Sequence, residues 1–266
     1  MEIASIALLL AVGALVGFVA GLLGIGGGML MVPFMTMVLG SQGFPADQVV
    51  KVAIATSLTT ILFTSLSSVR AHHARGAVRW DVVRLLVPGI LAGSLAGAQV
   101  ASRMNGRALA LAFAAFVGVS AVRMLRTQQP KPARQLPGAG GMLGAGAGIG
   151  VLSALVGAGG AFISVPFMTR CNVKIHNAVA TSAALGFPIA LAGTVGYVMA
   201  GWEATLPKYT LGFVYLPALL TISAASVLTA PLGARAAHAL PTDKLKRIFA
   251  LMLFALGGYM LYKALA

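Results

Sequence analysis

Ten apolar segments constrain the fold of this chain most strongly, because most of them have the length of a membrane-spanning helix. They cover residues 3–20, 29–39, 52–69, 85–101, 108–125, 139–156, 160–169, 178–200, 211–232 and 248–265. A bilayer core about 30 Å thick is crossed by about 20 helical residues. With 59% hydrophobic residues, 9% charged residues and a mean hydropathy of +0.93, the chain is predicted to be an all-α integral membrane protein.

Two of these segments, 29–39 and 160–169, are too short to cross a bilayer comfortably. Each follows a glycine cluster, Gly24-Ile25-Gly26-Gly27-Gly28 in one case and Gly157-Ala158-Gly159-Gly160 in the other. Lipid tolerates an interrupted helix only where protein or a water-filled cavity surrounds the break. We therefore expect each cluster to form the tip of a re-entrant or broken-helix hairpin.

The two halves of the chain resemble each other. LGIGGGMLMVPFMT (23–36) matches VGAGGAFISVPFMT (156–169), and VKVAIATSL (50–58) matches IHNAVATSA (175–183). An ordered series of matches indicates an internal duplication. We predict a first membrane repeat at 1–127, a cytoplasmic linker at 128–138 and a second repeat at 139–266, each repeat having one glycine-tipped hairpin and three full spans.

The basic residues predict the orientation of the repeats. Of the 19 Lys and Arg residues, 14 fall in the segments 70–84, 123–134, 170–177 and 233–247, which the positive-inside rule places in the cytoplasm. The loop 70–84 is then cytoplasmic and its counterpart around 201–210 external, so the repeats are inverted, as in many secondary transporters. Because topology accounts for most of the +14 charge, we expect the lipid bilayer and no nucleic acid as a partner.

The glycine tips suggest an anion site. The first N–H groups of a helix have no intrahelical acceptor and carry partial positive charge, so two half-helices that begin at the tips would bind a small anion between them. The alternative is that these glycines serve close helix packing, and that nearby hydroxyls bond carbonyls of their own helix. The predicted substrate-binding residues are Gly26, Gly27, Gly28, Gly159, Gly160, Thr56, Ser57, Thr181 and Ser182.

The charged side chains favour an anion over a cation. All five acidic residues fall outside the predicted spans, so no carboxylate is expected to bind a cation there. Arg70, His72, Arg103 and Arg235 lie near helix ends, where they would attract an anion or anchor the helices at the interface. Neither a Ser/His/Asp arrangement nor a zinc motif is present, and we expect no enzyme activity, metal or cofactor.

Several motifs together resemble the TauE/SafE sulfite exporter family. These are GLLGIGGGMLMVPFM and GVLSALVGAGGAFISVPFM, each followed by an A-T-S helix, and the basic loop HHARGAVRW. The second tip departs slightly, with Ala161 where the first has Gly28. The resemblance implies a multi-pass exporter of a small sulfur-containing anion, such as sulfite or an organosulfonate, in a bacterial-type cytoplasmic membrane.

The function expected from these features is export by alternating access, in which one repeat rocks against the other. Two other interpretations stay open: an anion channel that uses the same site, and a membrane scaffold protein whose glycines serve packing alone. The sequence leaves the energy coupling, the oligomeric state and the identity of the oxyanion undetermined.

Overall fold

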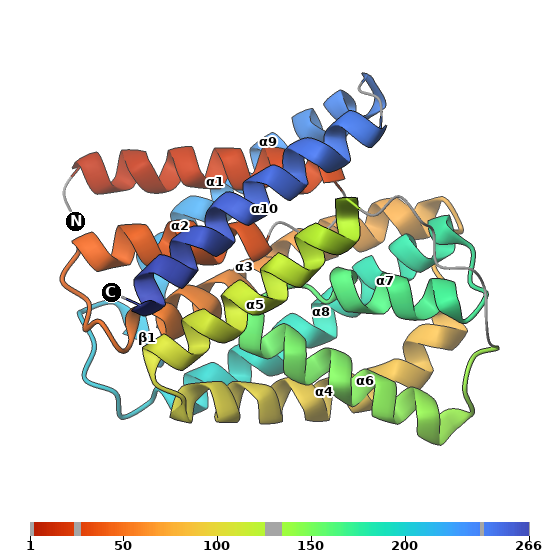
Figure 1. The fold of residues 1–266 in the computed structure, drawn as a ribbon, viewed down its shortest axis with the longest axis horizontal. Coiled ribbons are helices and arrows are strands. Elements are labelled where there is room, and N and C mark those ends of the chain that lie inside the picture. The colour runs from red at the N-terminus through yellow and green to blue at the C-terminus, as the bar shows by residue number, and fades with distance from the viewer. Residues whose placement is uncertain (1–2, 24–27, 126–134, 240–241, 266) are drawn as a thin grey trace.

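The computed structural model describes residues 3–23, 28–125, 135–239 and 242–265, which form ten helices and one short β-hairpin (Figure 1). The helices are α1 (Ile3–Leu23), α2 (Gly28–Ser41), α3 (Val49–Ala74), α4 (Trp80–Arg103), α5 (Gly106–Leu125), α6 (Ala139–Val156), α7 (Ala161–Arg170), α8 (Ile175–Ala200), α9 (Leu216–Ala239) and α10 (Thr242–Leu265), and the strands are β1 (Thr210–Leu211) and β2 (Val214–Tyr215).

The prediction of an α-helical integral membrane protein is confirmed. Each predicted apolar segment overlaps one helix of the structure. Within the described residues, six helices are long and apolar enough to cross a membrane, namely α3, α4, α5, α6, α8 and residues 247–265 of α10. The protein is therefore a multi-pass membrane protein in which α2 and α7 are the two short helices.

One local prediction was wrong, because residues 211–215 are not helical. Thr210–Leu211 pairs with Val214–Tyr215 in an antiparallel hairpin, and Gly212 adopts the left-handed φ of +55° at its turn. Helix α9 begins only at Leu216, with Pro217 in its first turn, where no backbone N–H is required. Hydropathy alone does not distinguish this apolar hairpin from the helix that follows it.

The short helices follow glycine-containing breaks. Helix α6 ends at Gly157, whose φ is +69°, and α7 starts after Gly160, whose φ is +78°. Figure 1 shows α2 running from the middle of the bundle to the end where α1 starts, whereas α7 runs from the middle to the opposite end. The hairpins α1–α2 and α6–α7 thus extend into the bundle from opposite ends.

Helices of the first half pack along helices of the second half, and small residues line these contacts. Helix α1 lies along α9, where Ser226 Oγ donates a hydrogen bond to Gly13 O over 2.9 Å. Helix α6 lies along α4, where a Cβ on Gly150 would lie 2.6 Å from Ile90 O and one on Gly97 2.8 Å from Val151 O. Small residues let membrane helices approach this closely, and dispersion contacts then hold them together.

Helices α3 and α8 cross at the centre of the structure. Residues 49–61 of α3 are all buried, and Leu58 packs onto the backbone of α8 at Gly193. The hydroxyl oxygens of Thr59 and Thr194 lie 3.2 Å apart across the same contact. Outer helices instead expose large apolar side chains, as lipid contact requires. The A-T-S segments of both helices are therefore buried, while other parts of the helices expose large apolar side chains such as Leu66 of α3 and Val195 of α8.

The α4–α6 contact can be tested with two glycines of α6. A Cβ on Gly146 would overlap the carbonyl oxygen of Leu86, whereas one on Gly148 would have no atom within 4 Å. We expect Gly146→Ala to lower the free energy of unfolding by about 1–3 kcal/mol through overpacking. Gly148→Ala should leave it unchanged or raise it by up to about 1 kcal/mol. Thermal unfolding of detergent-purified protein measures both, and equal effects would contradict the close packing.

Candidate functional site

Gly28, the one described residue of the first glycine cluster, meets Gly157 of the second cluster at Ser57 of α3. The Ser57 hydroxyl lies 3.0 Å from the carbonyl oxygens of both Gly28 and Gly157, so its single hydrogen is shared between them. A Cβ on Gly28 would lie 2.6 Å from Gly157 O. All three residues are buried. The Ser57 side chain thus joins the first residue of α2 to the C-cap residue of α6.

Packing explains some of the tip glycines but not all of them. Gly157 and Gly160 need the left-handed backbone, and a Cβ on Gly160 would lie 2.5 Å from Ile189 Cδ1. Gly159 has an ordinary φ and is half-buried, and a Cβ there would meet only Ile61, at 3.7 Å. No close packing contact or strained backbone therefore requires a glycine at position 159.

The start of α7 offers hydrogen-bond donors. The N–H groups of Ala161 and Phe162 have no intrahelical acceptor because they belong to the first turn, and no side chain caps this end. Ser153 Oγ lies 3.2 Å from the Cβ position of Gly160 and is buried without a hydrogen-bond partner in the described structure. A helix N-terminus beside an unpaired hydroxyl suits a small anion.

The repeat-related serines both contact short helices. Ser57 binds the backbone of α2 and of the α6–α7 turn, while Ser182 of α8 accepts a hydrogen bond from Ser164 of α7 over 2.7 Å. Ser164 and Ser182 are both buried. Each central helix is thus connected to the short helix of its own half through the serine of its A-T-S motif.

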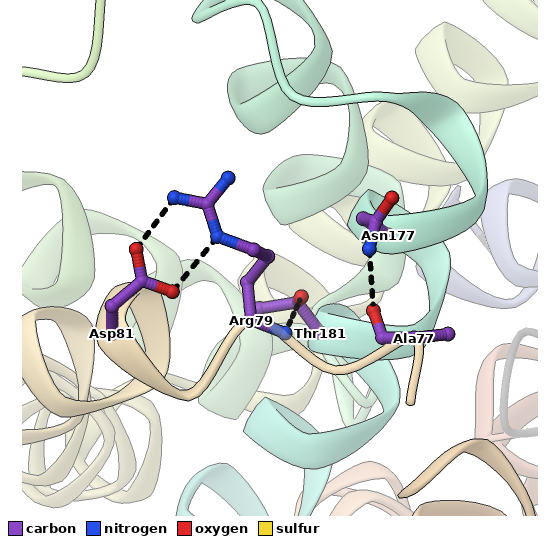
Figure 2. Close-up of polar contacts among 5 residues, drawn as sticks. All are labelled: Ala77, Arg79, Asp81, Asn177 and Thr181. Carbon is purple, nitrogen blue, oxygen red and sulfur yellow. Dashed lines mark hydrogen bonds and ion pairs between the residues drawn. The ribbon is translucent and has the colours of Figure 1, made fainter. Parts of the chain in front are cut away.

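The repeat-related threonines hold connecting segments instead. Thr56 Oγ1 accepts a hydrogen bond from Tyr215 N over 3.0 Å. Thr181 Oγ1 accepts one from Arg79 N, also over 3.0 Å, as Figure 2 shows. Asn177 Nδ2 also donates to Ala77 O over 3.0 Å. Neighbouring helical residues differ in direction by about 100°, so the threonines bind the connections while the serines face the tips.

The hydroxyl bonds to the helix's own carbonyls are made elsewhere. Thr59 donates to Ala55 O over 2.8 Å and Thr60 to Thr56 O over 3.0 Å. Thr56, Ser57 and Thr181 are bonded across elements. Bonding to a carbonyl of the same helix, the alternative considered for the site hydroxyls, is therefore seen at Thr59 and Thr60 and not at Thr56, Ser57 or Thr181.

An ion pair follows the segment held by Thr181. Arg79 Nε donates to Asp81 Oδ1 over 2.8 Å, and Figure 2 shows both guanidinium contacts. These hydrogen bonds raise the pKa of Arg79 above its ordinary value. Both side chains are exposed, so the pair contributes little to stability. It orients the segment before α4 while Thr181 holds its backbone.

Three of the four predicted anion-attracting side chains lie near the ends of their helices, away from the tips. Arg70 is exposed and His72 half-buried near the end of α3, and Arg103 is exposed at the opposite end of the bundle, as the last residue of α4. Arg235 lies on α9, and its side chain falls outside the described residues. Among the described residues, no three His, Cys, Asp or Glu side chains gather as metal ligands would.

Two predicted residues, Gly26 and Gly27, lie outside the described residues. Sequence reasoning did not select Gly157, Ser153 or Ser164, which the structure places beside the predicted ones. Gly157 belongs to the second glycine cluster, so the motif already contained a signal. Ser153 and Ser164 are single serines in apolar segments, and their position depends on how α6 and α7 pack.

The Ser57 bridge can be tested by removing its hydroxyl. Ser57→Ala would leave two buried carbonyl oxygens without their shared donor, and we expect a loss of about 1–3 kcal/mol in the free energy of unfolding. Ser120→Ala is the matched control, because Ser120 is also buried but bonds only Phe116 O of its own helix. Thermal unfolding measures both, and equal losses would show that the bridge is unimportant.

Comparison with known proteins places this architecture in a family. The family model for the sulfite exporter TauE/SafE matches residues 9–260. A probable membrane transporter protein of Haemophilus influenzae is 35% identical over 261 residues, covering 97% of this chain and 98% of that protein. One from Methanocaldococcus jannaschii is 25% identical over 256 residues, covering 96% and 94%. No solved structure matches the chain. The chain therefore belongs to the TauE/SafE sulfite exporter family, a family of membrane transporters.

Proposed function

We propose that this transporter exports a small sulfur-containing oxyanion, sulfite or an organosulfonate, across the cytoplasmic membrane by alternating access. The observation that carries the proposal is the meeting of both glycine tips at Ser57, beside the uncapped start of α7. The anion would bind between the tips, at the middle of the bundle. The family supports the class of substrate.

The Ser57 bridge favours an anion at this place. Carbonyl oxygens at a broken helix end would repel an anion, but the Ser57 hydroxyl hydrogen faces the oxygens of Gly28 and Gly157. The donors that remain are the first N–H groups of α7 and the unpaired Ser153 hydroxyl. Such preorganised donors are strong in surroundings that exclude water. We assign anion contact to these groups and to Gly159.

Inverted repeats are part of the proposal. Helices α1–α5 would correspond to α6–α10, and the packing supports this assignment, because α1 lies on α9 as α6 lies on α4. The pairs α3–α8 and α5–α10 each join equivalent helices. The hydrogen bonds from Tyr215 N to Thr56 and from Arg79 N to Thr181 also correspond, because each joins the residue directly before α9 or α4 to the threonine of an A-T-S motif. The 14 basic residues support a cytoplasmic location for the end with residues 70–84.

Two latches would then close the pathway. We call the bonds of Thr181 to Arg79 N and Asn177 to Ala77 O the cytoplasmic latch, and the bond of Thr56 to Tyr215 N the external latch. Both latches are formed in this structure. A carrier needs a barrier on each side of its site, whereas a conducting channel needs an open path. The two latches favour a carrier over the channel interpretation.

Binding and transport assays on purified protein test the proposal. We expect sulfite or sulfoacetate to raise the melting temperature more than chloride at equal ionic strength, because a ligand that binds only the folded state stabilises it. In proteoliposomes, uptake should saturate and show counterflow. Uptake without saturation or counterflow would indicate a channel. If none of sulfite, sulfate, thiosulfate or sulfoacetate binds the protein or crosses the liposome membrane, the oxyanion assignment is wrong. That result would support the interpretation as a membrane scaffold protein.

The latches predict a reciprocal pattern of amide exchange. Thr181→Val removes the acceptor of Arg79 N, and Thr56→Val removes that of Tyr215 N. A hydrogen bond worth about 1 kcal/mol corresponds to about fivefold faster exchange at the released amide. Hydrogen–deuterium exchange should therefore rise at residues 77–79 in the first variant and at residues 213–215 in the second. Each variant controls for the other, and exchange that rises at both ends in both variants would contradict two independent latches.

A further inference from the structure

Lys51 is a buried cation that the proposed anion site does not use. It lies in the first turn of α3, five residues before Thr56, at the end of the bundle that carries the β1–β2 hairpin. Its side chain is only 7% exposed. A lysine at a membrane interface usually extends its ammonium group into water. Lys51 instead keeps nearly its whole side chain inside the protein while its ammonium group still touches solvent, and this enclosure requires an explanation.

The hairpin covers Lys51 with an aromatic ring and not with a carboxylate. Lys51 Nζ lies 5.8 Å from the centroid of the Phe213 ring. Asp47, one helical turn earlier, is exposed, and the one ion pair between described residues joins Arg79 and Asp81. Within the described part of the chain, the ammonium of Lys51 therefore faces an aromatic surface without a carboxylate in ion-pair distance.

Phe213 is held in place by the same hairpin that forms the external latch. A Cβ on Gly201 would lie 2.5 Å from Phe213 N, and the ring packs edge-to-face on Tyr197 with centroids 6.3 Å apart. Two residues later, Tyr215 N donates to Thr56. If the hairpin moves away from α3, the external latch and the contact between Lys51 and Phe213 break together.

We infer that Lys51 binds the exported oxyanion on the external side of the tips, exchanging the ring of Phe213 for the anion when the hairpin opens. A largely enclosed ammonium without a carboxylate in ion-pair distance favours an anionic partner, and ionisable groups inside a membrane protein usually mark a pathway. A cation–π contact is weaker than a charge-assisted hydrogen bond to an oxyanion, so the exchange is favourable. The inference rests on the proposed function.

The sequence repeat makes this cation specific to one side. The matched segments VKVAIATSL and IHNAVATSA place His176 opposite Lys51. His176 is exposed. Of these two matched positions, the one near the external latch therefore carries a largely enclosed positive charge. This asymmetry would draw the anion from the tips toward the external side.

The charge of Lys51 can be separated from its bulk with two variants. We expect Lys51→Met to raise the half-saturating concentration of external sulfite by about tenfold or more, as the loss of one charge-assisted hydrogen bond predicts. Lys51→Arg should stay within about threefold because it keeps the charge. Counterflow of radiolabelled sulfite in right-side-out and inside-out vesicles measures both, and the effect should be smaller from the cytoplasmic side. Lys208→Met is the control, since Lys208 is exposed on the same connection.

The outcomes distinguish this inference from the proposed function. If wild-type protein neither binds nor transports any of the oxyanions, the proposed function fails first. If wild-type protein transports sulfite and Lys51→Met keeps its external half-saturation, the role of Lys51 alone is wrong. Equal losses in Lys51→Met and Lys51→Arg would also overturn it, because packing and not charge would then be responsible.

Labelling of the wild-type protein avoids any folding defect of the variants. We expect an amine-acetylating reagent to modify Lys51 slowly when the hairpin opens, and 10 mM sulfite, on the order of a weak substrate's saturating concentration, to protect it. Lys208 should be modified equally with and without sulfite. Absence of Lys51 modification in both conditions, or modification that sulfite does not reduce, would contradict the inference.

Discussion

The structure depends on satisfying the backbone polar groups of two interrupted helices where no water from the bilayer is available. In a membrane each unpaired N–H or C=O is costly, so breaks are confined to protein-lined positions. Here both breaks meet at the centre, and one hydroxyl, that of Ser57, serves a carbonyl oxygen from each. The central position of α3 and α8 follows, because only buried helices can present such hydroxyls to both tips.

This arrangement satisfies the acceptors of the break more completely than its donors. Gly157 N and Ala158 N are bonded to Ser153 O, but the first N–H groups of α7 lack an intrahelical acceptor and a side-chain cap. Ser153 Oγ is buried beside them without a partner. An electropositive break enclosed by apolar helices is unfavourable unless an anion or water occupies it. The same requirement that shapes the fold thus leads to the proposed substrate.

Much of this fold could be predicted from the sequence, because lipid imposes a strong pattern. Length and hydropathy located all ten helices, and the glycine clusters located both breaks. The hairpin at 210–215 was missed because its residues are as apolar as a helix. In the candidate site, the A-T-S motif selected hydroxyls that the structure bonds to other elements. It did not separate Ser57 from Thr56, which bind different elements, because that separation depends on the rotation of α3 relative to its neighbours.

The packing also constrains how such a transporter would move. A motion that separates the two sequence halves would pull α1 from α9 and α6 from α4, where glycines bring backbones into contact. Those contacts lack flexible side chains that could give way, so each pair should move as a unit. The latches are different, since each rests on one or two hydrogen bonds of about 1 kcal/mol each. Alternating access in this fold would therefore open at the connections before α4 and α9, between units that each mix helices of both repeats.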